Sequence, residues 1–150
     1  MSGRLDSHAV RGRRASARAC FRSMSANDNA VAEHADPFVE RAVAALRTDP
    51  AKRWTVAGLA RVAGLSRAPF ARRFREATGT SPRRWLIAHR LELARQQLAA
   101  GEPTLSEIAD AVGYASEFAF SKAFTRVVGI PPGVYRRMTR TTPGAFRAAA

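Results

Sequence analysis

Two basic side chains lie 50 positions apart in similar surroundings, and both could hydrogen-bond an anionic partner. Arg72 carries a planar guanidinium, which can donate two parallel hydrogen bonds to a phosphate or to the edge of a guanine base. Lys122 carries an ammonium, which binds the same acceptors less rigidly. Whether the two act together depends on the elements that present them.

The segments around Arg72 and Lys122 repeat one another. The order is an apolar residue with an alanine, a glycine, two phenylalanines four positions apart and a second glycine. It begins at Leu59 and again at Ile108, and one extra residue, Ala115, changes the offset from 49 to 50. The matched pairs are Phe70 with Phe120 and Phe74 with Phe124. Because a small crossing residue, a glycine turn and an aromatic anchor suit a helix-turn-helix, each copy is predicted to form one.

Helical geometry predicts which side chains face outward on the second helix of each copy. Successive residues turn by about 100°, so the phenylalanines define the buried side and Arg72 points away from it. The same construction turns Lys122 outward. Most exposed cations are only solvated, but the coincidence of the two positions favours a binding role.

The remaining pattern predicts helices along the chain from Asp36. The expected helices run from Pro37 to the stop at Asp49, then over about 55–63, 67–78, 82–99, 105–112, 116–128 and 132–138. The expected serine caps are Ser66, Ser81 and Ser116. No strand pattern competes, so the predicted fold class is all-α, a seven-helix domain of two helix-turn-helix modules joined by a long linker helix.

The charge points to a polyanionic partner. The chain has 25 Lys and Arg against 12 Asp and Glu, a formal charge of +13. Six arginines and three acidic residues give residues 1–35 a charge of +3, which leaves +10 for the rest. A balance this basic suits nucleic acid or an anionic membrane surface. No apolar run of 18 residues occurs, so no membrane span is expected.

The sequence offers no grouping suited to catalysis or metal binding. His8, His34 and His89 lie far apart without ligand spacing, and Cys20 is the single cysteine. No glycine-rich phosphate loop and no nucleophile with a base is recognisable. We therefore expect no enzyme, no cofactor and no metal site. A lone cysteine also fits a reducing cytoplasm.

The chain divides into three expected parts. Residues 1–35 are rich in Arg, Ser and Ala and are predicted to be a disordered arm, with Met24 as an alternative start. Residues 36–140 form the double helix-turn-helix domain, and residues 141–150 form a flexible tail. The linker helix of about 18 residues spans roughly 27 Å. With its flanking turns it could hold the two second helices near the 34 Å repeat of the major groove.

Two stretches carry a resemblance to a known family. LARVAGLSRAPFARRFREATGTSPRRWL, residues 59–86, and GYASEFAFSKAFTRVVGIPPGVYRR, residues 113–137, resemble the DNA-binding domain of the AraC/XylS family of bacterial transcription regulators. The resemblance implies a cytoplasmic, nucleoid-associated protein that binds double-stranded promoter DNA, usually as an activator that contacts RNA polymerase. It implies base contacts from Arg67, Ala68, Ala71, Arg72, Ser116, Glu117, Phe118, Ser121 and Lys122.

The chemistry of these side chains suggests different contacts. Arg72 and Lys122 can donate hydrogen bonds to guanine, and Ala68 can contact a thymine methyl. Glu117 could accept a hydrogen bond from N4 of cytosine, or it could only interact with the positive N-terminal end of its helix dipole. Phe118 could touch thymine methyls or pack against its own partner helix, and packing is favoured. The expected phosphate contacts or solvated charges are Arg73, Arg75, Arg83, Arg84 and Arg126, with Arg67 also suited to phosphate.

Most members of this family carry a further sensing or dimerisation domain, which 35 polar residues cannot form. The chain is therefore either a stand-alone reader or a fragment of a longer regulator, and no effector ligand is expected within it. Two other classes stay open: a nonspecific architectural nucleic-acid binder driven by charge, and a helical protein-interaction module.

Overall fold

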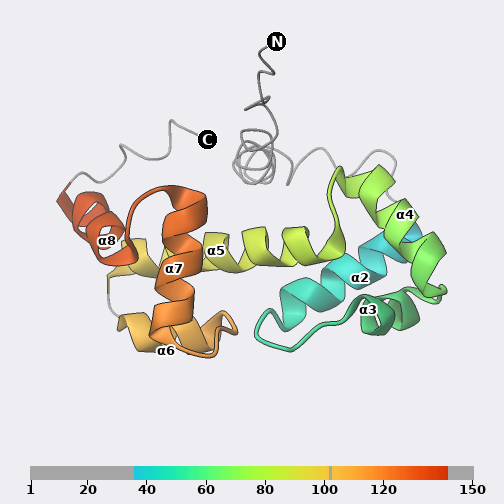
Figure 1. Ribbon diagram of the computed structural model, residues 1–150, viewed down its shortest axis with the longest axis horizontal. Helices are drawn as coiled ribbons and strands as arrows, with labels where there is room; N and C mark the ends of the chain where they lie inside the picture. Colours follow the sequence, from blue (N-terminus) through green and yellow to red (C-terminus); the bar gives the residue numbers. More distant parts are fainter. Residues whose placement is uncertain (1–35, 102, 142–150) are drawn as a thin grey trace, which may run out of the picture.

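The computed structural model describes residues 36–101 and 103–141, and over these ranges it consists of helices and their connections (Figure 1). The helices are α2 (Pro37–Thr48), α3 (Val56–Ala63), α4 (Arg67–Thr78), α5 (Pro82–Ala100), α6 (Leu105–Ala111), α7 (Glu117–Val128) and α8 (Pro132–Thr141). All seven predicted helices are confirmed, and α8 continues three residues beyond the expected end at Met138. The predicted arm, with Cys20 and Met24, and residues 142–150 lie outside the described residues.

Helix α5 connects two groups of helices (Figure 1). Helices α2, α3 and α4 gather at one end of it, and α6, α7 and α8 gather at the other. At about 1.5 Å per residue, its 19 residues span roughly 28 Å. None of the helices in the described ranges is long and apolar enough to cross a membrane. We call the two groups the first module and the second module.

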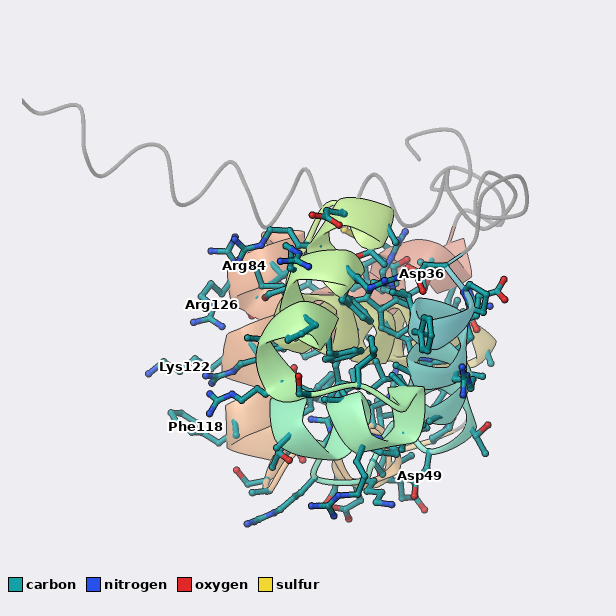
Figure 2. The ribbon with its side chains drawn as sticks, turned by 90° about the vertical axis from the view of Figure 1, so that its right-hand side faces the viewer. Asp36, Asp49, Arg84, Phe118, Lys122 and Arg126 are labelled. Atoms are coloured by element: carbon teal, nitrogen blue, oxygen red, sulfur yellow. The ribbon has the colours of Figure 1, made fainter. Side chains whose placement is uncertain are left out.

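Capping residues set where several helices begin. The carboxylate of Asp36 accepts a hydrogen bond from the backbone N–H of Phe38 at 2.9 Å, and Pro37 occupies the first turn. Asp36 lies away from the side of the molecule that carries α7 (Figure 2). Ser81 accepts from the N–H of Arg84 at 3.4 Å, as predicted. At α6, Thr104 and Glu107 form a reciprocal capping box.

Ser66 and Ser116 are the N-cap residues of α4 and α7, as predicted, but only Ser116 makes a side-chain capping hydrogen bond. Ser116 accepts a hydrogen bond from the N–H of Ala119, three residues on, at 3.1 Å. In the first module the corresponding residue is Pro69, which has no N–H to donate. Ser66 therefore stands at the N-cap position of α4 without a side-chain capping bond.

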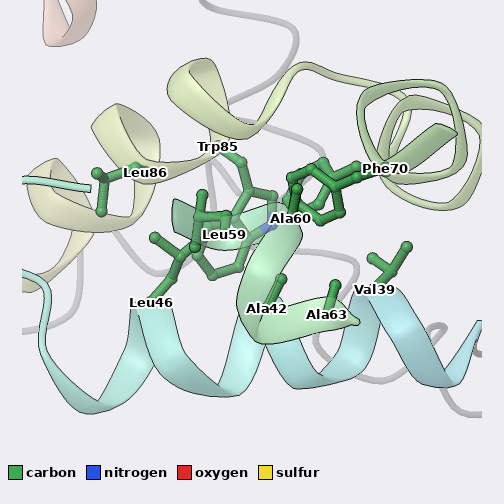
Figure 3. Packing of buried hydrophobic residues seen from close by; sticks show 10 residues of the cluster. Val39, Ala42, Leu46, Leu59, Ala60, Ala63, Phe70, Trp85 and Leu86 are labelled. Atoms are coloured by element: carbon green, nitrogen blue, oxygen red, sulfur yellow. The ribbon is translucent and has the colours of Figure 1, made fainter. Parts of the chain in front are cut away.

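The first module closes around its own hydrophobic core (Figure 3). Leu46 of α2 and Phe70 and Phe74 of α4 are fully buried. The Phe74 ring meets Trp85 of α5 edge to face at 6.4 Å between centroids. Small alanines let α2 and α3 approach each other closely: Ala42, Ala60 and Ala63.

The second module repeats this arrangement on the other half of α5. Leu91, Ala94 and Leu98 of α5 are fully buried in a core that they share with α6, α7 and α8. Phe120 and Phe124 are buried as predicted, with ring centroids 5.6 Å apart. Since successive stretches of α5 complete the two cores, α5 is a structural part of both modules.

Candidate nucleic-acid interface

Helices α4 and α7 expose the same positions to solvent over their first eight residues. Over Arg67–Phe74 and Glu117–Phe124 the sequence of exposed, half-buried and buried residues is identical. In both helices the first, second and sixth residues are exposed, and the fourth and eighth are the buried phenylalanines. The repeat seen in the sequence is therefore also a repeat of accessible surface.

The sixth residue of each exposed pattern is the predicted cation. Arg72 and Lys122 are both exposed, as the helical geometry predicts. The first two positions of each helix differ in chemistry: α4 presents Arg67 and Ala68, whereas α7 presents Glu117 and Phe118. The two helices thus offer the same layout with different hydrogen-bonding and apolar groups.

Phe118 is strongly exposed, which contradicts the favoured prediction that it packs within the protein. The residue is 77% exposed, whereas Phe120, two positions later, is fully buried. The reason is its direction on α7, because the buried side of that helix is already filled by Phe120 and Phe124. An exposed phenyl ring gains little hydrophobic stabilisation from the fold, because its surface stays in contact with water.

Ala71 and Ser121 occupy repeat-related positions, and both are half-buried. They lie between the outward and inward sides of their helices, so they present less surface than their neighbours. The hydroxyl oxygen of Ser116 accepts the capping hydrogen bond of α7, but the residue itself is exposed and its O–H can still donate.

Arg72 has an acidic neighbour on its own helix. Its Nε lies 3.9 Å from Oε1 of Glu76, one turn further on, and both side chains are largely exposed. Exposed pairs of this kind contribute about 0–1 kcal/mol, because water solvates both charges well. Arg72 can therefore exchange Glu76 for another acceptor at little cost.

Arg73 contacts the first module itself. Its Nη1 donates to Oδ2 of Asp36 at 2.9 Å, and its guanidinium lies 5.2 Å from the centre of the Phe38 ring. Burial acts to raise the pKa of Asp36, but hydrogen bonds from Arg73, Phe38 and Val39 outweigh it and hold that pKa below its ordinary value. Because Asp36 compensates its charge, Arg73 is less suited to bind phosphate than the other predicted phosphate contacts.

The other four predicted phosphate contacts are exposed: Arg75, Arg83, Arg84 and Arg126. Arg84, from the start of α5, and Arg126, from α7, point to the same side of the molecule as Phe118 and Lys122 (Figure 2). Asp49, like Asp36, lies on a different side. One side of the molecule thus combines groups from both modules that suit an anionic, base-bearing partner.

The fold and this surface define the class of protein. Two helix-turn-helix modules, each with an exposed second helix, form a double helix-turn-helix nucleic-acid-binding domain. The helix-turn-helix domain family matches residues 59–138. An AraC-like transcription regulator of Streptomyces lividans is 50% identical over 103 residues, which are 69% of this chain and 34% of that protein. The chain therefore belongs to the AraC-type helix-turn-helix family.

Two further relatives support the same family. The RCS-specific HTH-type transcriptional activator RclR of Escherichia coli K12 is 45% identical over 91 residues, 61% of this chain and 32% of that protein. The DNA-binding domain of AdpA, solved in complex with a target DNA, matches with a TM-score of 0.67 and 34% identity. That match covers 74% of this chain and 100% of the AdpA domain. The chain spans about a third of the length of the curated relatives.

Proposed function

We propose that this chain regulates transcription by binding double-stranded promoter DNA, with α4 and α7 in successive major grooves on one face of the duplex. The observation that carries the proposal is the identical exposure of the first eight residues of the two helices, with Arg72 and Lys122 at equivalent positions. The domain of AdpA, which is similar over its whole length, was solved with a target DNA. An α-helix fits the major groove of B-form DNA, where every base pair presents a distinct pattern of acceptors and donors.

Base recognition is assigned to the exposed sides of the two helices. Arg72 donates to O6 and N7 of guanine, and Lys122 does the same from α7 with a single flexible ammonium. The ring of Phe118 contacts the C5 methyl of thymine, and Glu117 accepts from N4 of cytosine. The remaining proposed base contacts are Arg67, Ala68, Ala71, Ser116 and Ser121.

Phosphate binding is assigned to the four exposed arginines that flank these helices: Arg75, Arg83, Arg84 and Arg126. Such contacts fix the position of the protein on the duplex without reading its sequence. They also make affinity fall as the salt concentration rises, because each phosphate contact releases condensed counterions and that release gains less entropy at higher salt. The acidic residues Asp36 and Asp49 lie away from Phe118, Lys122 and Arg126, which favours one orientation of the domain towards DNA (Figure 2).

Binding-site selection from random duplex DNA at two salt concentrations tests this function. We expect an asymmetric motif of two blocks whose centres are about 10 base pairs apart, one turn of the duplex. Arg72→Ala should relax the preference at one base pair of one block, and Lys122→Ala should do so in the other block. Arg41→Ala is the charge-matched control, because Arg41 lies on α2 and stacks on Phe38 within the first module.

Three results would contradict the proposal. Equal weakening of all sequences by Arg72→Ala and Lys122→Ala would identify a nonspecific architectural binder. An absence of DNA affinity even at low salt would favour a protein-interaction module. If both variants selected the same motif as the unsubstituted protein, α4 and α7 would not be the helices that recognise bases.

We further propose that the bound chain activates transcription by contacting RNA polymerase. RclR, a relative at 45% identity, is named as an activator, and this supports the sign of the effect. Transcription in vitro from a promoter that carries the selected motif measures it directly. Transcript levels should rise with added protein, and a fall would show that the chain represses.

A further inference from the structure

The loop between α2 and α3 touches the second module as well as the first. Arg90, near the middle of α5, donates from Nε to the carbonyl of Pro50 at 2.7 Å. Its Nη2 lies 3.1 Å from the carbonyl oxygen of Lys52 and 3.4 Å from that of Ala51. A single guanidinium therefore binds three consecutive carbonyl groups of residues 50–52. The half-buried position of Arg90 lowers its pKa, but a guanidinium stays charged at any physiological pH.

This loop is held firmly by the first module. The carboxylate of Asp49 accepts from the N–H of Lys52 at 3.1 Å, and the carbonyl of Asp49 accepts from the indole N–H of Trp54 at 2.8 Å. Trp54 packs against the hydrophobic core of the first module. The Lys52 ammonium lies 4.4 Å from the centre of the Trp54 ring. Residues 50–52 therefore move with the first module.

The turn between α6 and α7 approaches the same loop from the second module (Figure 1). A Cβ atom added to Gly113 would lie 2.6 Å from both Cα and O of Ala51 and 2.8 Å from Nη2 of Arg90. The next residue, Tyr114, has its ring centre 6.0 Å from the guanidinium carbon of Arg90. Burial raises the pKa of the Tyr114 hydroxyl, consistent with its packing in this contact.

Gly64, the repeat-related glycine of the first module, shows that this contact is specific to Gly113. Both glycines have a positive φ, 78° at Gly64 and 79° at Gly113. A Cβ at Gly64 would meet only the end of the Arg41 side chain, at the ordinary contact distance of 3.7 Å. The positive φ favours glycine at both positions. At Gly113 a side chain is excluded for a second reason, because the loop of the first module lies too close.

We propose that Arg90 and Gly113, together with residues 50–52, form an inter-module lock that fixes the spacing and rotation of α4 relative to α7. Helix α5 by itself is one connection, about which two modules can twist and bend. The lock adds a second connection beside it. This inference rests on the proposed function, because its consequence is a single preferred distance between the two DNA blocks.

The consequence for DNA is steep spacing selectivity. One added base pair moves the second block by about 3.4 Å along the duplex and by about 35° around it, since about ten base pairs make one turn of about 34 Å. A locked pair of helices cannot follow this displacement while both remain in their grooves. An unlocked pair can follow it in part.

The test uses the selected motif with one base pair inserted or removed between its blocks. For the unsubstituted protein, we expect either change to weaken binding by more than about tenfold, the effect of losing at least one base-pair contact. Arg90→Ala and Gly113→Ala should weaken binding at the selected spacing and reduce the spacing penalty to about threefold or less. Their base preferences within each block should stay unchanged.

Two matched variants separate the lock from a general loss of structure. Gly64→Ala imposes similar backbone strain, because its φ is almost the same, but it leaves the lock intact. Arg95→Ala also removes an arginine from α5, one whose Nε donates to the hydroxyl of Tyr135 within the second module. Both should keep the spacing penalty of the unsubstituted protein even where they lower stability. An unchanged spacing penalty in folded Arg90→Ala would overturn the lock.

A measurement without DNA distinguishes failure of the lock from failure of the proposed function. Spin labels can be attached at exposed residues of the two modules, in Ala77→Cys and Ser106→Cys, with the native thiol removed by Cys20→Ser. The label-to-label distance distribution should be narrow and should broaden on Arg90→Ala. Equal widths would reject the lock even if DNA binding were specific. A broadened distribution with no selected DNA motif would support the lock and reject the proposed function.

Discussion

Phe118→Ala should separate DNA recognition from stability, because the ring is exposed on a helix whose other phenylalanines form the core. Full burial of a phenylalanine contributes up to about 3 kcal/mol, so a ring with only about a quarter of its surface buried contributes less than about 0.8 kcal/mol. Phe120→Ala is the matched control. Phe120 is fully buried, and its replacement should lower the free energy of unfolding by about 3–5 kcal/mol.

The effect on DNA binding should be larger than the effect on stability. If the groove covers about 80 Å² of the ring, at about 25 cal/mol per Å² the contact is worth about 2 kcal/mol, or roughly a 30-fold change in the dissociation constant. The gain is specific to thymine if the ring meets the C5 methyl group. Replacing that thymine with deoxyuracil removes one methyl, about 0.8 kcal/mol or roughly fourfold in affinity.

Two measurements check this prediction. Urea unfolding followed by circular dichroism gives the stability of both variants, and fluorescence anisotropy on the selected duplex gives the affinities. The unsubstituted protein should distinguish thymine from deoxyuracil at one position, and Phe118→Ala should not. Equal affinities of the unsubstituted protein and Phe118→Ala would refute the proposed contact. A loss of stability comparable to that of Phe120→Ala would refute the description of the ring as exposed.

Four other predictions have defined expected outcomes. Arg126→Ala should lower the slope of log affinity against log salt by about 0.9, with similar weakening on all duplexes, and an unchanged slope would exclude it from phosphate binding. Ser116→Ala should cost about 1 kcal/mol in urea unfolding, whereas Ser66→Ala should cost much less, and equal costs would contradict the difference in capping. Backbone and side-chain hydrogen bonds from Thr104 hold the pKa of Glu107 below its ordinary value, so their stabilisation is present above that value and is lost as the pH falls through the lowered pKa. The melting temperature should fall less between pH 6 and pH 3 in Glu107→Gln than in the unsubstituted protein, because only the contribution of Asp36, whose pKa is also lowered, then remains. Glu76→Gln, which releases Arg72, should raise DNA affinity a few-fold, and reduced affinity would show that the carboxylate positions the guanidinium usefully.

Local patterns were sufficient to predict the helices and most of the candidate surface. The repeat located the buried phenylalanines, and helical geometry correctly turned Arg72 and Lys122 outward. The missing capping hydrogen bond at Ser66 was also readable in principle, because Pro69 stands where the N–H donor would be needed. The cap and the outward directions depend on residues within about one turn of each other, and the repeat is visible directly in the sequence.

Contacts between distant segments were not predictable in this way. Arg73 follows Asp36 by 37 positions, and nothing near either residue indicates that they pair. Arg90 follows the carbonyl groups that it binds by about 40 positions, and backbone carbonyls leave no mark in a sequence. Gly113 could be recognised as a turn glycine, but its approach to Ala51 depends on how the two modules pack.

Helix α5, which completes both cores, also bears on how promoter occupancy depends on protein concentration. A regulator that reads two half-sites as a dimer must first associate, so its occupancy varies with the square of the concentration at low abundance. Here both recognition helices belong to one covalent unit. Once one helix is bound, the other meets its block at an effective concentration set by the tether, and combined affinity can exceed that of either helix alone by about 10²–10⁴. We therefore expect occupancy by this domain to rise in simple proportion to its abundance.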